Sequence, residues 1–144
     1  MRLDTRVRSA LTALLLLAAC GWAGWRLLNV YTVRTYQPFL RPTREFLRAG
    51  LALDSASLAR QGADPAAVRW VLDTGRHDAA FLRALEASLY VGHGMRRGDT
   101  TLVLFGTRRY GECSGWPLTI LFAGAPPAAR IRRVTGGCRA LGHA

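Results

Sequence analysis

Lysine is absent from the sequence, and all 20 basic residues among the 144 are arginine. A lysine nucleophile or a lysine Schiff base is therefore excluded. Carboxylates are scarce, because nine aspartates and glutamates accompany those arginines and the net charge is +11. The length leaves room for one compact domain with an anchor, and it excludes two or three domains. Half of the residues are hydrophobic, which argues against a disordered chain.

The sequence also lacks the motifs of common catalytic sites. It contains no phosphate-binding loop, no dinucleotide-binding fingerprint and no Gly-x-Ser-x-Gly turn. Of the three histidines, His77 alone has carboxylates nearby in sequence, on Asp73 and Asp78. Asp78 is better placed to cap a helix than to assist a general base. We therefore expect a non-catalytic protein with no metal site and no cofactor.

The first thirty residues hold a long uncharged stretch. It runs from Ser9 to Trp25, and its 17 residues would form a helix about 26 Å long, at the short end for a membrane span. Three arginines precede it, which by the positive-inside rule places the N-terminus in the cytoplasm. Aromatic residues typical of a membrane interface stand at Trp22, Trp25 and Tyr31. We predict a transmembrane anchor over residues 1–36, helical from Ala10 to about Val33.

A second interpretation of this region stays open. Leu17-Ala18-Ala19-Cys20 resembles the lipobox of bacterial lipoprotein signal peptides, which implies removal of residues 1–19 and lipidation of Cys20. The segment Gly-Trp-Ala-Gly-Trp after Cys20 continues the apolar pattern and favours the uncleaved anchor. We therefore expect a single-pass protein of the bacterial inner membrane with its C-terminal domain in the periplasm, or else a lipid-anchored lipoprotein of the periplasm or outer membrane.

Two further cysteines, Cys113 and Cys138, lie in the part that would be exported. A pair of cysteines in an oxidising compartment indicates a disulfide, and closing its loop would stabilise the fold by about 3 kcal/mol. Two unpaired buried thiols are the alternative. A zinc site is not indicated, because neither Cys-x-x-Cys nor His-x3-His spacing is present.

Residues 37–144 show helical patterns first and strand patterns afterwards. Gln37-Pro38 and Arg41-Pro42 interrupt the anchor helix. Asp54, Asp64-Pro65 and Asp78 are typical helix starts. The expected helices begin at Thr43, Ser55, Pro65 and Asp78, and the expected strands cover residues 90–94, 100–107, 118–123 and 130–135. This order predicts an α+β fold, in which a transmembrane helix is followed by short helices packed on a curved antiparallel sheet.

The strand patterns have apolar residues on both faces. Leu102 and Leu104 alternate with Val103 and Phe105. A sheet with one solvated face would alternate with polar residues instead. The second face therefore lines a pocket, docks another protein, or is covered by the domain's own helices, and these three alternatives stay open. We name Val103, Phe105 and Leu121 as candidate partner contacts.

The order of elements resembles the NTF2-like group of α+β cone folds. The segments that carry the resemblance are Phe46-Leu47-Arg48-Ala49-Gly50, Asp54, Trp70-Val71-Leu72, Thr101–Phe105, Leu118–Phe122 and Arg130–Val134. It covers about Pro42 to Cys138. The resemblance implies a cavity in the curved sheet, which members of the group use to bind small molecules, to catalyse isomerisations or to dock proteins.

Arginine pairs recur in the part that would be exported. They define a basic patch of Arg96, Arg97, Arg108, Arg109, Arg130, Arg132 and Arg133. If neighbouring strands bring these residues together, they would attract anionic lipid headgroups or an acidic protein surface. No aromatic and basic motif indicates nucleic-acid binding.

We therefore predict a non-catalytic, membrane-anchored accessory subunit that docks on a larger membrane protein assembly from the periplasmic side. Its partners would be membrane lipid and other subunits of that complex, and Gly21 and Gly24 would allow close helix contacts. The oligomeric state stays open. The alternative is a small-ligand-binding or enzymatic cone domain tethered as a lipoprotein.

Overall fold

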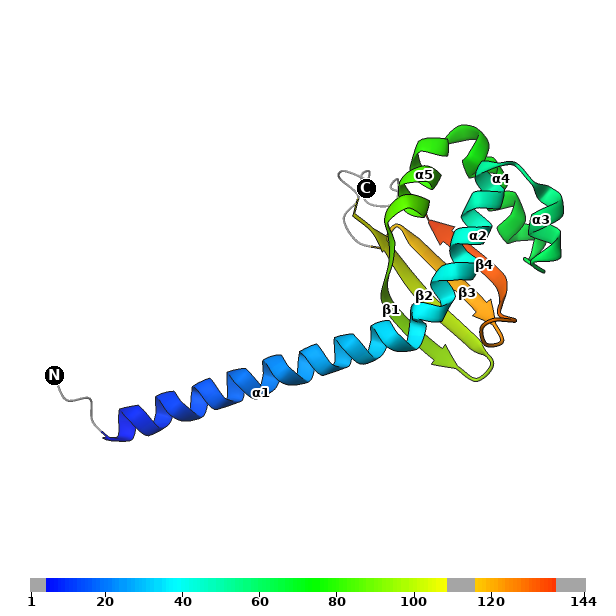
Figure 1. The fold of residues 1–144 in the computed structure, drawn as a ribbon. Helices are drawn as coiled ribbons and strands as arrows, with labels where there is room; N and C mark the ends of the chain where they lie inside the picture. Colours follow the sequence, from blue (N-terminus) through cyan, green and yellow to red (C-terminus); the bar gives the residue numbers. More distant parts are fainter. Residues whose placement is uncertain (1–4, 109–115, 137–144) are drawn as a thin grey trace. The chain divides into compact units, whose positions relative to one another are not determined.

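The computed structural model describes residues 5–108 and 116–136, and the chain falls into two units, Met1–Thr32 and Val33–Ala144 (Figure 1). We call the second unit the domain. The elements are α1 (Thr5–Tyr36), the 3-10 helix η1 (Gln37–Phe39), α2 (Leu40–Leu51), α3 (Ser55–Arg60), α4 (Pro65–His77), α5 (Ala79–Ser88), β1 (Leu89–Arg97), β2 (Thr100–Thr107), β3 (Leu118–Ala123) and β4 (Arg130–Gly136). The predicted α+β class is confirmed.

The helix α1 is the apolar segment expected from the sequence. It has 32 residues and is therefore about 48 Å long. The hydroxyl groups of Thr12 and Thr32 donate hydrogen bonds to the carbonyl oxygens of Arg8 and Leu28, at 2.9 and 2.8 Å, so both hydroxyls are satisfied within the helix. The predicted helix from Ala10 to Val33 is confirmed, and by length and composition α1 is able to cross a membrane.

Three aspartates begin helices, as their sequence context predicts. The Asp54 carboxylate accepts a hydrogen bond of 3.0 Å from the N–H of Ser57 at the start of α3. Asp64 caps α4 and Asp78 caps α5 in the same way, at 3.0 and 3.2 Å. Each carboxylate satisfies an N–H group that has no partner inside its own helix.

Prolines mark the change from α1 to the helices of the domain. Gln37–Phe39 forms the short helix η1 with Pro38 inside it. The next helix, α2, begins at Leu40, three residues before the predicted start at Thr43. Pro42 then lies in the first turn, where a helix tolerates proline because the N–H groups there have no helical partner.

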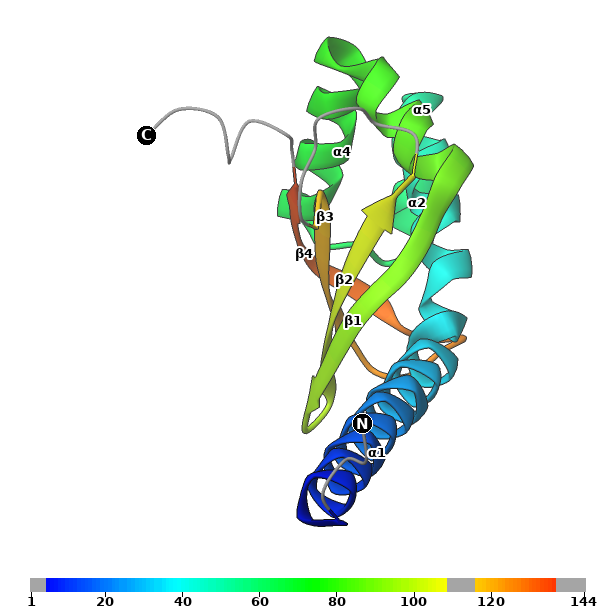
Figure 2. The ribbon, with the colours of Figure 1, turned by 90° about the vertical axis from the view of Figure 1, so that its left-hand side faces the viewer.

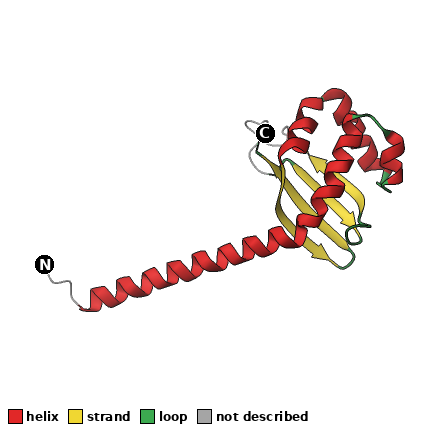
Figure 3. Ribbon diagram, viewed as in Figure 1, coloured by secondary structure: helices red, strands yellow, loops and turns green. Residues whose placement is uncertain are grey.

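The four strands form one antiparallel sheet in the order β1-β2-β3-β4. The bounds of β2 and β3 agree with the prediction, and β4 is one residue longer. β1 extends to Arg97, beyond the predicted residues 90–94, because it pairs along the whole of β2. A bulge lies between Val91 and His93. Figure 2 shows α2 and α5 on one side of the sheet. Figure 3, coloured by secondary structure, shows the helices of the domain grouped together beside the strands.

One hydrophobic core lies between the helices and the sheet. On β2 and β3, Val103, Phe105 and Ile120 are inaccessible to solvent. Phe46 of α2 and Leu85 of α5 are equally buried and belong to the same cluster. Burying a side chain of this size contributes roughly 1.5–3 kcal/mol, so these alternate strand positions stabilise the domain.

Two glycines allow α2 and α4 to approach each other closely. A Cβ on Gly50 would overlap the side chain of Val71, and a Cβ on Gly75 would overlap the carbonyl oxygen of Gly50. Larger residues at these positions would separate the two helices and open the core beneath them.

The first residues of the domain pack on the sheet. The ring of Tyr36 covers Gly94 on β1, where a Cβ would overlap it. The ring centroid of Phe39 lies 4.7 Å from that of Phe122 on β3. Through these contacts, the last turn of α1 packs on the sheet, and so does η1. Both lie near the end of the sheet at which the β1–β2 turn is found.

Candidate functional site

The strands present a second face, opposite to the helices, which we call the outer face. In the pairing register, His93, Leu104 and Thr119 lie side by side across β1, β2 and β3. The next row on this face consists of Met95, Leu102, Leu121 and Arg133. These residues are exposed or half-buried, whereas on β2 and β3 their neighbours along the strand are buried in the core. The outer face is therefore an accessible surface with an aliphatic centre.

The structure corrects two of the three candidate partner contacts. Val103 and Phe105 have no exposed area, because they lie on the face that packs against the helices. Leu121 does lie on the outer face and is half-buried. Both faces of β2 are apolar, so alternation alone was unable to identify the core face. The accessible aliphatic residues of β2 are Leu102 and Leu104.

Aromatic side chains occupy one end of the outer face. The Tyr90 ring lies over Gly106, and the Trp116 ring reaches across β2 to lie over Gly92 on β1. The two rings meet edge to face with centroids 6.3 Å apart. Tyr90 is 37% exposed and Trp116 45%, which is high for side chains of this size. We call Tyr90 and Trp116 the aromatic pair.

Sequence reasoning missed the aromatic pair. Gly92 and Gly106, two glycines inside predicted strands, could have indicated where the rings lie. A strand glycine leaves space for a neighbouring ring, and here both glycines are covered by one. Arg108 completes this end, with its guanidinium carbon 5.7 Å from the Tyr90 ring centroid.

The predicted basic patch is divided by the fold. Arg96 and Arg97 end β1, and Arg130 begins β4, so these three lie at the end of the sheet formed by the β1–β2 turn and the β3–β4 connection. Arg132 and Arg133 lie further along β4, which is an edge strand. Arg108 lies at the opposite end, so the strands do not bring it together with the other arginines of the patch. Arg109 lies outside the described residues.

Charge is distributed unevenly over the domain. Residues 37–88 carry seven arginines and six carboxylates, whereas residues 89–136 carry seven arginines and two carboxylates. On the helices, Glu45 pairs with Arg41 at 2.9 Å and Glu86 pairs with Arg48 at 2.7 Å. The strands themselves contain five arginines and no carboxylate. The sheet is therefore the basic side of the domain.

The helix-capping carboxylate Asp54 has a lowered pKa. The main cause is the hydrogen bond from the Ser57 hydroxyl, at 2.6 Å, and the bond from the Ser57 N–H adds to it. Both bonds favour the ionised carboxylate. This shift is explained by capping and does not indicate chemistry at a site.

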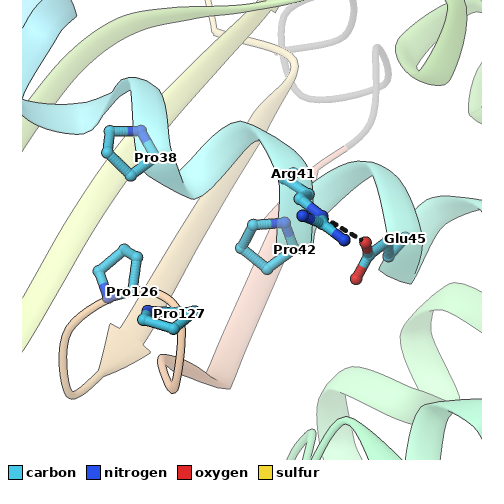
Figure 4. Close-up of a pocket in the computed structure, with 6 residues that line it drawn as sticks. All are labelled: Pro38, Arg41, Pro42, Glu45, Pro126 and Pro127. Carbon is cyan, nitrogen blue, oxygen red and sulfur yellow. Dashed lines mark hydrogen bonds and ion pairs between the residues drawn. The ribbon is translucent and has the colours of Figure 1, made fainter.

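A cleft lined by four prolines lies between the start of α2 and the β3–β4 connection (Figure 4). Pro38, Arg41, Pro42, Glu45, Pro126 and Pro127 line its volume of about 540 Å³. The Arg41 Nε donates to the Glu45 carboxylate at 2.9 Å. The two charged groups of the cleft therefore satisfy each other, and the prolines contribute no side-chain donor or acceptor. Glu45 is the one carboxylate of the lining, and its pairing with Arg41 argues against a role as general base.

The carboxylates that flank His77 in the sequence make contacts with other groups. His77 is exposed at the end of α4, and the Asp73 carboxylate faces Arg76 at 3.4 Å. The Asp78 carboxylate caps α5, as expected. Among the described residues, no group of three or more histidine, cysteine, aspartate or glutamate side chains could hold a metal ion.

The predicted membrane-facing residues are exposed along α1. Trp22, Trp25 and Tyr31 are 62%, 63% and 70% accessible. A Cβ on Gly21 or Gly24 would meet nothing within 4 Å, so the surface there is open. Cys20 is exposed as a free thiol. The predicted disulfide of Cys113 and Cys138 lies outside the described residues.

No family model, curated protein or solved structure matches the chain. The resemblances to the NTF2-like group and to a lipobox therefore stay predictions.

Proposed function

We propose that the chain is a non-catalytic accessory subunit that is anchored in a membrane by α1 and binds a larger membrane protein assembly through the outer face. The observation that carries this proposal is the outer face itself. It presents Leu102, Leu104 and Leu121 between the aromatic pair and the arginines of β4. Protein interfaces combine aromatic and aliphatic residues at the centre with charged residues at the rim.

The charge of the sheet favours a different protein over a second copy as the partner. Two outer faces placed against each other would bring arginines such as Arg97 and Arg133 close together, with no strand carboxylate to compensate. Like charges at an interface oppose association. We therefore expect a partner surface that is apolar at its centre and acidic around it.

The anchor would raise the effective concentration of the domain near partners in the same membrane. The exposed leucines, Trp22, Trp25 and Tyr31 of α1 suit contact with lipid and its interface. Gly21 and Gly24 would let a partner helix approach. In this proposal the domain lies on the periplasmic side of a bacterial inner membrane.

A ligand-binding or enzymatic role, with the chain tethered as a lipoprotein, is the less favoured alternative. The proline-lined cleft is of a size that holds small ligands. Its one charged pair is internally satisfied, so it offers few groups that would orient a substrate.

Site-specific crosslinking in the native membrane tests the proposed function. A photoreactive residue replaces Leu104 on the outer face, and the matched control replaces Ala80, which is exposed on α5. We expect crosslinks from position 104 to one defined membrane protein, and their loss when Leu121→Arg is added. Equal crosslinking from position 80, or crosslinks from position 104 that Leu121→Arg does not change, would refute docking through the outer face. His77→Ala should have no effect, and a loss of cellular function with this variant would favour an enzymatic role.

A further inference from the structure

Three arginines of the two edge strands lie at the same end of the sheet, which we call the arginine end. It comprises Arg96, Arg97 and Arg130. The pairing register places Arg97, Thr100, Ala123 and Arg130 in one row across the four strands. The Gly124 N–H donates to the Asp99 carbonyl oxygen at 2.9 Å, which joins the β3–β4 connection to the β1–β2 turn. Arg96 and Arg97 on one edge strand and Arg130 on the other therefore lie at the same end of the sheet, with β2 and β3 between them.

The guanidinium groups of the arginine end are accessible. All three side chains are exposed, and none makes an ion pair within the described part of the chain. Asp99 is the carboxylate of the β1–β2 turn, so the three arginines outnumber it. The excess positive charge is available to a ligand.

The arginine end is also where the chain enters the domain from α1. Tyr36, the last residue of α1, covers Gly94, which lies three residues before Arg97. The ring of Phe39 packs at a tilt against that of Phe122, which lies beside Ala123 of the arginine row. These contacts lie within the domain itself. They place the arginine end next to the point at which an anchor in the membrane would emerge.

We propose that the arginine end binds the phosphate groups of anionic lipids next to the anchor. This proposal rests on the membrane anchor of the proposed function, but it concerns a different surface and a different ligand from the docking on the outer face. Guanidinium groups bind phosphate oxygens with two parallel hydrogen bonds. Each arginine near an anionic membrane surface strengthens binding about fivefold. The ligand is a membrane lipid headgroup and not a soluble phosphate, because the anchor keeps these groups at the bilayer.

Lipid selectivity of the full chain tests the proposal. The chain is reconstituted into phosphatidylcholine vesicles that contain either spin-labelled phosphatidylglycerol or spin-labelled phosphatidylcholine, and spin resonance measures how strongly each lipid is retained at the protein. We expect a preference for phosphatidylglycerol. Replacing Arg96, Arg97 and Arg130 together with glutamine should lower that preference at least about fivefold. The control replaces Arg69, Arg76 and Arg83 of α4 and α5 with glutamine, which removes the same charge and should leave the preference unchanged.

Further measurements separate the possible sources of a result. An equal loss in both triple variants, or no loss in either, overturns the proposal, because neither depends on the arginine end. Displacement of phosphatidylglycerol by inorganic phosphate in solution would show a soluble ligand and also overturns it. An unchanged lipid preference together with loss of a crosslinked acidic protein would show that the arginine end binds protein instead.

Folding and anchoring have their own readouts. Circular dichroism must show the same fold in both triple variants. If the glutamine variant unfolds, the three arginines are replaced by lysine instead, and this variant should retain the preference for phosphatidylglycerol. About 0.5 M NaCl should then abolish that preference by screening the charges. Persistence of the preference in salt would overturn the proposal. Extraction of the wild-type chain from the vesicles by alkaline carbonate would refute the membrane anchor, and with it the proposed function, independently of lipid selectivity.

Discussion

Leu104 and Phe105 are adjacent on β2 and lie on opposite faces of the sheet, so truncation of each to alanine tests the assignment of the faces. Phe105 has no exposed area and pairs with Val91 and Leu118. Phe105→Ala should lower the free energy of unfolding by about 3–5 kcal/mol, because it removes buried surface and leaves a cavity. Leu104 is half-buried, and Leu104→Ala should cost less than about 1.5 kcal/mol.

Thermal unfolding of the full chain in detergent, followed by near-ultraviolet circular dichroism, measures the difference. For a domain of this size, 1 kcal/mol changes the Tm by about 4–8 °C, so Phe105→Ala should lower the Tm by at least about 12 °C. Leu104→Ala should lower it by far less. Similar losses for the two variants, or a larger loss for Leu104→Ala, would show that the outer face is covered or that the faces are reversed.

Three further predictions concern single side chains. Gly92→Ala should displace Trp116 from the sheet and cost about 1–3 kcal/mol, measured by chemical denaturation; an unchanged stability would mean that the ring does not rest there. Gly50→Ala should cost at least as much by forcing α2 away from α4, although alanine has the higher helix propensity; a gain in stability on denaturation would contradict the close approach of the two helices. The lowered pKa of Asp54 means that its ionised form stabilises the fold above the ordinary carboxyl pKa, and that this contribution disappears as the pH falls through the folded-state pKa. The Tm difference between wild type and Asp54→Asn should therefore shrink in acid, and a constant difference would contradict the role of Ser57.

Local signals in the sequence were sufficient for most elements of the domain. Asp64-Pro65 and Asp78 begin helices because their carboxylates reach N–H groups within three residues, an interaction that needs no tertiary contact. The bounds of β2 and β3 also followed from β-forming runs between turn residues. The start of α2 was misplaced, since proline is compatible with the first turn of a helix as well as with its interruption.

Composition determined the apolar character of α1 and the excess of arginine, because both are properties of the chain and not of its packing. The face of the sheet that forms the core was decided by the tertiary structure. Val103 and Leu104 are equally apolar, and contact with the helices buries one and leaves the other accessible. Strand register likewise placed Arg97 and Arg130 at the same end of the sheet and Arg108 at the opposite end. Such pairings join residues far apart in the sequence, so no local pattern contains them.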